Sequence, residues 1–422
     1  MQTESASNHK SRSSTRILEA SVQSILDTFG QPDVRPICPK RLSGDEAGEC
    51  FNTPRPGDID SMNIEAPVSD IGNTTYKYFV EVSPTILPDV GMLEIPALET
   101  MVEPAKPKQH WSAYNAAQMN EIRIFDDLLA ELVGTIEEPV QEGRGRRRLS
   151  LSTQIFSAVL KVYSQVSSRR SQSILDRAQD EGDLKHAPHY NAISKTLLDK
   201  SMTPILQRLI RLSAQPLADI EMDFAVDSSG FRCSNFGAYR GEKYDLKREH
   251  NWIKAHICTG VKTNIVTDVK VTDGKANDCP HLAGLVQNTA KTFDISEVSA
   301  DKGYTSRDNL QLIADLGATP FIPFKSNATE KGMGRKMWRK MYHYFQLNRD
   351  DFMAHYHKRS NVESTFGAIK MKFGETLKSK DPTAQTNELL CKILAYNITV
   401  LIHEMYESGI TPDFLIPETP SA

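Results

Sequence analysis

The pattern of apolar positions changes at about residue 111, and this change divides the chain. Met119, Ile122 and Phe125 begin a series at helical spacing, which Gly134 ends. The helices predicted next cover 151–166, 171–181, 189–199 and 202–213. The segment 111–215 is therefore predicted to be an all-helical domain.

After Pro216 the apolar residues form the short runs and alternations typical of strands. The predicted strands are 222–226, 252–259, 265–271, 295–300 and 319–324, with helices between the last three and after them. Pro320 and Pro323 confine the last strand to a sheet edge, because proline has no N–H to donate. This order predicts an α/β domain over 216–408, with a mixed sheet covered by helices.

The first 110 residues hold 11 of the 22 prolines and show little periodicity. They are predicted to be a low-complexity, partly disordered region with one short strand at Tyr76–Val82. Residues 409–422 are predicted to be a C-terminal tail.

The net charge of −4 conceals an uneven distribution. Residues 1–110 carry 10 Lys/Arg and 16 Asp/Glu, whereas Lys331 to Lys372 carry 10 Lys/Arg and 3 acidic residues. A local basic field attracts phosphate, so a nucleic-acid partner is compatible with the acidic total. Basic residues in 111–215 suit a DNA-reading domain, and a helical scaffold with solvated charges is the alternative.

Other features argue against membrane, secreted and zinc-binding proteins. Residues Met1–Arg16 lack the apolar segment of a signal peptide. The run Ile393–Ile402, interrupted by Asn397, is too short and too polar to span a bilayer. The six cysteines form no Cys-x-x-Cys pair, which predicts reduced thiols. We therefore expect a cytoplasmic protein with no membrane partner.

Charged and aromatic residues form a stripe on one predicted helix. At 100° per residue, Arg359, Glu363 and Lys370 fall within roughly 60° of Tyr356. The acid can hold a metal ion while the cations hold phosphate oxygens on either side of it. A solvated stripe with an Arg359–Glu363 ion pair is the alternative.

Asp227 and Asp301 each follow a short apolar strand and precede a turn that contains glycine. Carboxylates at the ends of adjacent strands can converge, and a helix that crosses those ends can supply a third. Such a set can hold two divalent cations, and Mg²⁺ prefers oxygen ligands. Asp223 is a rival for the first position, although Asp227 is preferred because it lies at the strand end.

The spacing Tyr-x2-Arg-x3-Glu-x6-Lys occurs at Tyr356, Arg359, Glu363 and Lys370. It resembles the signature of insertion-sequence transposases of the Asp-Asp-Glu (DDE) type. Asp227-Ser228-Ser229-Gly230 resembles the first-aspartate turn of that family, and Ala300-Asp301-Lys302-Gly303-Tyr304 resembles its second-aspartate motif. The similarity covers about Met222 to Lys372, with a helical tail after it.

This resemblance implies a ribonuclease H-like fold and an enzyme that cleaves and joins DNA strands. The catalytic residues, which are also the metal ligands, would be Asp227, Asp301 and Glu363. The DNA-binding residues would be Tyr356, Arg359 and Lys370. The cofactor would be Mg²⁺, with two ions expected and Mn²⁺ as a substitute.

The implied substrates are double-stranded DNA, namely the terminal inverted repeats of a mobile element and a target DNA. Pairing of two ends suggests a homodimer. Two other hypotheses stay open: a structure-specific nuclease of the same fold, and a non-catalytic, transposon-derived DNA-binding protein. Trp338 is a candidate for stacking on a flipped base, with ordinary packing as the alternative. Asn277-Asp278 is predicted to be a helix N-cap.

Overall fold

The structure, a computed structural model, describes residues 110–140, 148–233, 252–330 and 336–414, and four short strands nearer the N-terminus. The chain divides into two compact units, Met1–Ala105 and Lys106–Ala422. The division of the second unit into a helical domain and a sheet domain stays a prediction.

The backbone of the first unit contains two antiparallel pairs of strands. β1 (Met62–Glu65) pairs with β4 (Phe79–Val82), and β2 (Ser69–Ile71) pairs with β3 (Thr74–Tyr76). The single strand predicted at Tyr76–Val82 is therefore divided between β3 and β4. The rest of the predicted low-complexity region lies outside the described residues.

The second unit contains a six-stranded mixed sheet in the order β7-β6-β5-β8-β9, with β10 beside β5. Three strands pair with one another in antiparallel fashion: β5 (Asp223–Cys233), β6 (Trp252–Gly260) and β7 (Val266–Asp273). Three join in parallel: β8 (Glu297–Ala300) and β10 (Thr376–Leu377) on β5, and β9 (Thr319–Phe321) on β8. The predicted mixed sheet is confirmed, and so is the edge position of the proline-containing strand.

β5 is longer than the predicted strand, and it absorbs a predicted turn. Asp227-Ser228-Ser229-Gly230 continues the strand because β6 pairs with β5 as far as Arg232 opposite Trp252. Gly230 lies under the Trp252 ring, where an added Cβ would be 3.2 Å from a ring carbon. The turn-forming tendency of these residues is therefore overridden by pairing with β6.

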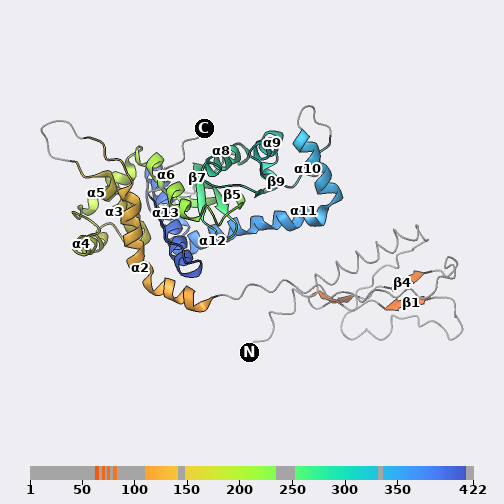
Figure 1. Cartoon of the computed structure of the whole chain (residues 1–422), viewed down its shortest axis with the longest axis horizontal. Coiled ribbons are helices and arrows are strands. Elements are labelled where there is room, and N and C mark those ends of the chain that lie inside the picture. The colour runs from red at the N-terminus through yellow and green to blue at the C-terminus, as the bar shows by residue number, and fades with distance from the viewer. Residues whose placement is uncertain are drawn as a thin grey trace, which may run out of the picture. The chain divides into compact units, whose positions relative to one another are not determined.

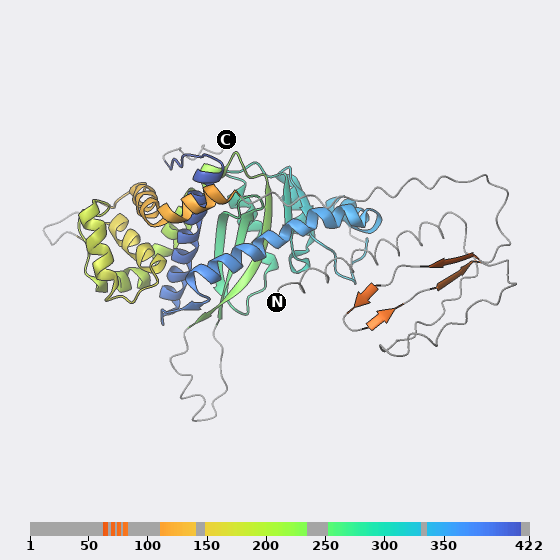
Figure 2. The ribbon, with the colours of Figure 1, turned by 90° about the horizontal axis from the view of Figure 1, so that it is seen from below.

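Helices cover both faces of the sheet. α8 (Leu282–Thr289) and α9 (Arg307–Asp315) lie on one side, and α12 (Ser360–Phe373) crosses the strands on the other (Figures 1 and 2). α12 continues a chain of helices formed by α10 (Lys336–Leu347), α11 (Arg349–Tyr356) and a 3-10 turn, η5 (His357–Arg359). Other 3-10 turns occupy Gln215–Leu217, Cys279–His281 and Lys302–Tyr304.

The other helices form a bundle around one central helix. They are α2 (Trp111–Gly134), α3 (Leu151–Tyr163), α4 (Ser171–Glu181), α5 (Tyr190–Leu198), α6 (Met202–Ala214) and the central α13 (Pro382–Glu407). α13 packs against α2, α3, α5, α6 and the edge strand β7, so one core runs from the bundle into the sheet. Among the described helices, α13 is the one long and apolar enough to cross a membrane, and most of it is buried inside the protein. The predicted helices of 111–215 are confirmed.

Candidate active site

Asp227 and Asp301 lie at the same level of the sheet. β8 pairs in parallel with β5, and the last registered pair is Val226 opposite Ala300. The next residue on each strand is the predicted metal ligand. At Asp227, β5 continues and stays paired with β6, whereas at Asp301 the chain leaves β8 and enters a 3-10 turn. The two aspartates therefore occupy equivalent positions at the end of the parallel pairing.

The carboxylate of Asp227 is mostly buried and fully engaged. Its side chain is 20% exposed. Oδ1 accepts a hydrogen bond from the Ser228 N–H at 2.7 Å, and Oδ2 accepts one from Arg359 at 2.6 Å. Burial raises the pKa of Asp227, and the charges of Asp301 and Glu363 add to this, while Ser228 and Arg359 oppose it. The group sits where negative charge is crowded, so a cation would stabilise its ionised form.

Arg359 spans the first and third predicted acids. One guanidinium nitrogen contacts Asp227 at 2.6 Å, and the other donates to Glu363 at 2.5 Å. The expected Arg359–Glu363 pair therefore forms, and it extends to the sheet. The ligand atoms of Asp227, Asp301 and Glu363 do not all lie within 4.8 Å of one another. The structure brings Glu363 toward Asp227 through Arg359 and not by direct convergence of three carboxylates.

Lys370 and Tyr356 flank this arrangement on the same face. The Lys370 ammonium donates to the Ser229 hydroxyl at 2.7 Å and lies 5.2 Å from the centre of the Phe231 ring. Burial lowers the pKa of Lys370. The Arg359 guanidinium lies 5.8 Å from the centre of the Tyr356 ring. Both predicted DNA-binding cations therefore contact β5, the strand that carries Asp227.

The sequence predicts one continuous α-helix through these residues, but the structure interrupts it. Residues His357–Arg359 form a 3-10 turn between α11 and α12. A 3-10 turn advances about 120° per residue, so Tyr356 is rotated by roughly 60° from its predicted direction relative to Glu363. The tighter turn brings Lys358 and Arg359 against the sheet, where both make ion pairs.

Asp223, the rival first acid, already has a cationic partner. Its Oδ2 accepts a hydrogen bond from Lys358 at 2.7 Å, and it lies opposite Glu297 at the start of the parallel pairing. The same ammonium reaches Glu297 at 2.8 Å. Asp223 lies four residues before Asp227 on β5, at the opposite end of the pairing between β5 and β8.

The surroundings of two residues near the site were not predicted from the sequence. Tyr304 is the last residue of the second-aspartate motif and is 1% exposed; burial raises the pKa of its phenol, and the charges of Asp227, Asp278 and Asp301 add to the effect. Asp278 occupies the predicted N-cap position, before the 3-10 turn Cys279–His281, but its side chain makes no capping hydrogen bond and pairs with Lys254 at 2.9 Å. Neither contact has a local sequence signal, because each joins segments distant in the chain.

Trp338 packs as an ordinary structural residue. Its ring meets Phe324 edge-on with ring centres 4.9 Å apart, and its Nε1 donates to the Thr329 carbonyl at 3.0 Å. The Arg307 guanidinium lies 5.5 Å from the ring centre. These contacts hold the ring in place beside α9 and α10.

A second acidic cluster lies in the helical bundle. Ligand atoms of Asp126, Glu181 and Asp183 lie within 4.8 Å of one another, and Arg177 contacts Asp126 at 2.5 Å and Glu181 at 3.7 Å. Burial raises the pKa of Asp126 to about 6, although Arg177 opposes the shift. Arg177 thus already supplies a cation to this cluster.

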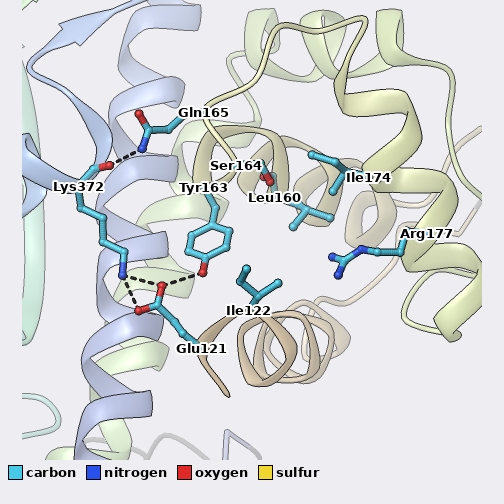
Figure 3. A pocket seen from close by; sticks show the side chains of 9 residues that line it. All are labelled: Glu121, Ile122, Leu160, Tyr163, Ser164, Gln165, Ile174, Arg177 and Lys372. Atoms are coloured by element: carbon cyan, nitrogen blue, oxygen red, sulfur yellow. Dashed lines mark hydrogen bonds and ion pairs between the residues drawn. The ribbon is translucent and has the colours of Figure 1, made fainter. Parts of the chain in front are cut away.

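The C-terminal end of α12 is anchored to the bundle beside a pocket of about 460 Å³ (Figure 3). Lys372 donates to both carboxylate oxygens of Glu121 at 2.7 Å, and the Tyr163 hydroxyl donates to the same carboxylate at 2.7 Å. Gln165 donates to the Lys372 carbonyl at 2.5 Å. Lys372 therefore holds α12 in place, and its charge is neutralised within the protein.

Comparison with known proteins gives a family for the segment that contains the site. Residues 221–398 match the family model described as the transposase DDE domain, and all six residues predicted to be catalytic or DNA-binding fall within that segment. The cryo-EM structure of the piggyBac transposase synaptic complex with hairpin DNA resembles 72% of this chain over 77% of its own length, at 12% identity and a TM-score of 0.32, a likeness too low to transfer a fold. Residues 221–398 are therefore similar to a transposase DDE domain.

Proposed function

We propose that this chain is a metal-dependent DNA transposase that cleaves the ends of its mobile element and transfers them into target DNA. The observation that carries the proposal is the position of Asp227 and Asp301 directly after the last paired residues of two neighbouring parallel strands. The helix bearing Glu363 is joined to Asp227 by Arg359 at this same point. The family match over 221–398 supports the same assignment.

The fold that we propose for this domain is ribonuclease H-like. Three antiparallel strands followed by two parallel ones, in the order β7-β6-β5-β8-β9, support it. In such a sheet the first and fourth strands in chain order are neighbours, and their aspartates meet at one end. We further propose that 111–215 recognises the element's ends, that 216–408 is catalytic, and that pairing of two ends requires a homodimer.

The donor set suits Mg²⁺, because all three side chains offer carboxylate oxygens. The Arg359 guanidinium lies between Asp227 and Glu363 and marks this as a place where positive charge is stabilised. Asp227, Asp301 and Glu363 would hold two ions, with Mn²⁺ as a substitute. Bound ions would supply an activated water and stabilise the leaving 3′ oxygen.

The chain's own cations would bind and orient the DNA backbone. Arg359 offers a planar, bidentate donor, and Lys370 offers a point charge on the same face. Arg359 has to release Asp227 and Glu363 before it can bind a phosphate in bidentate fashion. Tyr356 lies beside Arg359 and would limit the directions that its guanidinium can take.

The test is an in vitro cleavage and joining assay with the element's flanking repeats, a plasmid target, and Mg²⁺ or a chelator. Asp301→Asn and Glu363→Gln should each lower product formation by at least about a thousandfold, because each removes a charged ligand from the site. Asp315→Asn, an exposed acid at the end of α9, is the control and should leave the rate unchanged.

The products separate the alternatives. Joined products that require metal support the transposase, whereas nicked or cut DNA without joining would favour a nuclease. DNA binding that weakens with salt, without products in Mg²⁺ or Mn²⁺, would favour a non-catalytic DNA-binding protein. Full activity in the Asp301→Asn protein would overturn the site assignment.

A further inference from the structure

We propose that Lys358 is a positioning residue that, with Asp223, Glu297 and His355, forms a clamp holding the acid-bearing helix at one register on the sheet. The consequence for metal binding rests on the proposed function, but the clamp itself does not. These four residues form the strand clamp.

The strand clamp joins one ammonium to two neighbouring strands. Asp223 on β5 and Glu297 on β8 are directly opposite each other in the parallel register. Lys358 donates to Asp223 at 2.7 Å and to Glu297 at 2.8 Å. His355, one turn earlier, approaches the Glu297 carboxylate at 2.9 Å. Two carboxylates from separate strands therefore hold the end of α11 and the 3-10 turn that leads into α12.

A third strand is also engaged. The His355 ring stacks on Phe321 of β9, with ring centres 4.4 Å apart and planes 7° apart. The side chains of Lys358 and Asp223 are each 31% exposed, and that of Glu297 is 17% exposed. Removing one partner from such a partly buried network leaves the remaining charges without compensation, which costs more than the loss of an exposed pair. Despite burial, the hydrogen bonds from Lys358 and His355 keep the pKa of Glu297 below its usual value.

The strand clamp and the candidate metal site lie on the same strands at matched positions. Asp223 precedes Asp227 by four residues on β5, and Glu297 precedes Asp301 by the same number. On the helix, Lys358 directly precedes Arg359, which contacts Asp227. A slip of the helix by one residue would move it about 1.5 Å and turn it about 100°. Such a slip would break the clamp and the Arg359 contact together.

This arrangement explains why two similar aspartates on one strand have different partners. Asp223 faces a lysine that fixes the helix, whereas Asp227 faces the arginine that also contacts Glu363. The helix is thereby held from the clamp at one end to the Lys372–Glu121 pair at the other. Glu363 lies between these two anchors.

The experiment compares full-length proteins carrying Lys358→Met, Lys358→Arg and Arg211→Met. Arg211 pairs with Asp268 at 3.0 Å, which joins α6 to β7, so its loss removes a helix–strand ion pair outside the clamp. Backbone hydrogen exchange over 357–366, Mn²⁺ affinity, and kcat for end cleavage are measured for each protein. Glu297→Gln serves as a second variant if Lys358→Met does not fold.

We expect Lys358→Met to speed exchange in 357–366, to weaken Mn²⁺ binding by about tenfold, and to lower kcat by about a hundredfold, as displacement of a positioned group by about 1 Å does. Lys358→Arg should recover most of each loss, because arginine can still reach both carboxylates. Arg211→Met should lose stability without changing Mn²⁺ affinity or local exchange over 357–366.

Unchanged exchange in the Lys358→Met protein would overturn the clamp. A loosened helix with unchanged Mn²⁺ affinity and kcat would overturn its positioning role. If the unaltered protein neither binds Mn²⁺ nor cleaves DNA, the proposed function fails, and the exchange measurement still decides whether the clamp holds the helix.

Discussion

The guanidinium of Arg359 occupies the space between two predicted metal ligands. It contacts Asp227 at 2.6 Å and Glu363 at 2.5 Å, and its side chain is only 19% exposed. A metal ion and this guanidinium would repel each other at such short range. Metal binding is therefore expected to displace the Arg359 guanidinium from the two carboxylates. A DNA phosphate could then bind the displaced guanidinium.

Replacing Arg359 by glutamine should tighten Mn²⁺ binding in the absence of DNA by about tenfold or more, because a competing cation is removed. The same change should weaken cleavage of end DNA. Mn²⁺ titration followed by electron paramagnetic resonance measures the first effect. Arg339→Gln, an exposed cation on α10, is the control. Weaker Mn²⁺ binding in the Arg359→Gln protein would contradict the competition.

His256 is a buried imidazole next to the candidate site. Its side chain is 0% exposed, and its Nε2 lies 2.9 Å from the Thr272 hydroxyl. Burial lowers the pKa of His256 from 6.5 to about 4, with the charge of His281 adding and that of Asp278 opposing. The folded protein therefore takes up this proton less readily than the unfolded chain between these two pH values.

The free energy of unfolding should consequently fall as pH drops from 6.5 toward 4, because the unfolded chain binds the extra proton. His256→Gln should flatten this decrease by up to about 3 kcal/mol. Urea unfolding at pH 7, 5.5 and 4 measures it, with His186→Gln, an exposed histidine, as the control. The same pH slope in the variant and the unaltered protein would refute the assignment.

At the scale of elements, the buried side chain of Asn397 joins α13 to the edge strand β7. The Asn397 amide donates to the Val266 carbonyl at 2.7 Å and accepts from the Val266 N–H at 3.0 Å. It also donates to Ser213 at 2.9 Å. Asn397 thus pairs with the first residue of edge strand β7 much as a neighbouring strand would. The sequence pattern shows Asn397 only as a polar residue that interrupts an apolar run.

Asn397→Leu should lower the free energy of unfolding by about 3 kcal/mol, because it leaves the N–H and C=O of Val266 buried without partners. The shift in the urea midpoint measures this. Thr386→Ala is the control on the same helix, since its hydroxyl bonds only to the Pro382 carbonyl, and it should change stability by less than about 0.5 kcal/mol. Similar losses in both variants would contradict the role given to Asn397.

At the scale of the whole molecule, charge and compactness divide the chain at nearly the same place. The units Met1–Ala105 and Lys106–Ala422 are each compact. Residues 1–105 carry 8 Lys/Arg and 16 Asp/Glu, whereas 106–422 carry 42 and 38. The first unit is therefore the source of the acidic total, and the second unit by itself is basic.

A chain of residues 106–422 should bind random-sequence duplex DNA about tenfold more tightly than the full chain at low salt. The difference should vanish at high salt, where ions screen long-range repulsion. Fluorescence anisotropy at several salt concentrations measures it, and circular dichroism checks that the shorter chain is folded. Weaker binding by the shorter chain would instead assign a DNA contact to residues 1–105.

Much of the element order follows from periodicity, and the failures share one cause. The helices of 111–215, the order of strands and helices along the chain and the edge position of β9 are confirmed because each depends on residues within one segment. The turn predicted at Asp227–Gly230 is wrong because β6, more than twenty residues away, extends the ladder across it. Helical periodicity also does not predict the 3-10 turn at His357–Arg359, because the ion pairs that accompany the turn are with the distant strand β5.

The sequence alone was enough to predict the kind of chemistry, because carboxylates at strand ends and an acid between cations on a helix are local patterns. Tertiary structure decided which partner each charge has. Lys358 or Arg359 could face either aspartate of β5 by spacing alone, and only the packed helix pairs them with Asp223 and Asp227. The physical reason is that ionic contacts depend on distances of a few Å between segments more than a hundred residues apart, which local periodicity does not encode.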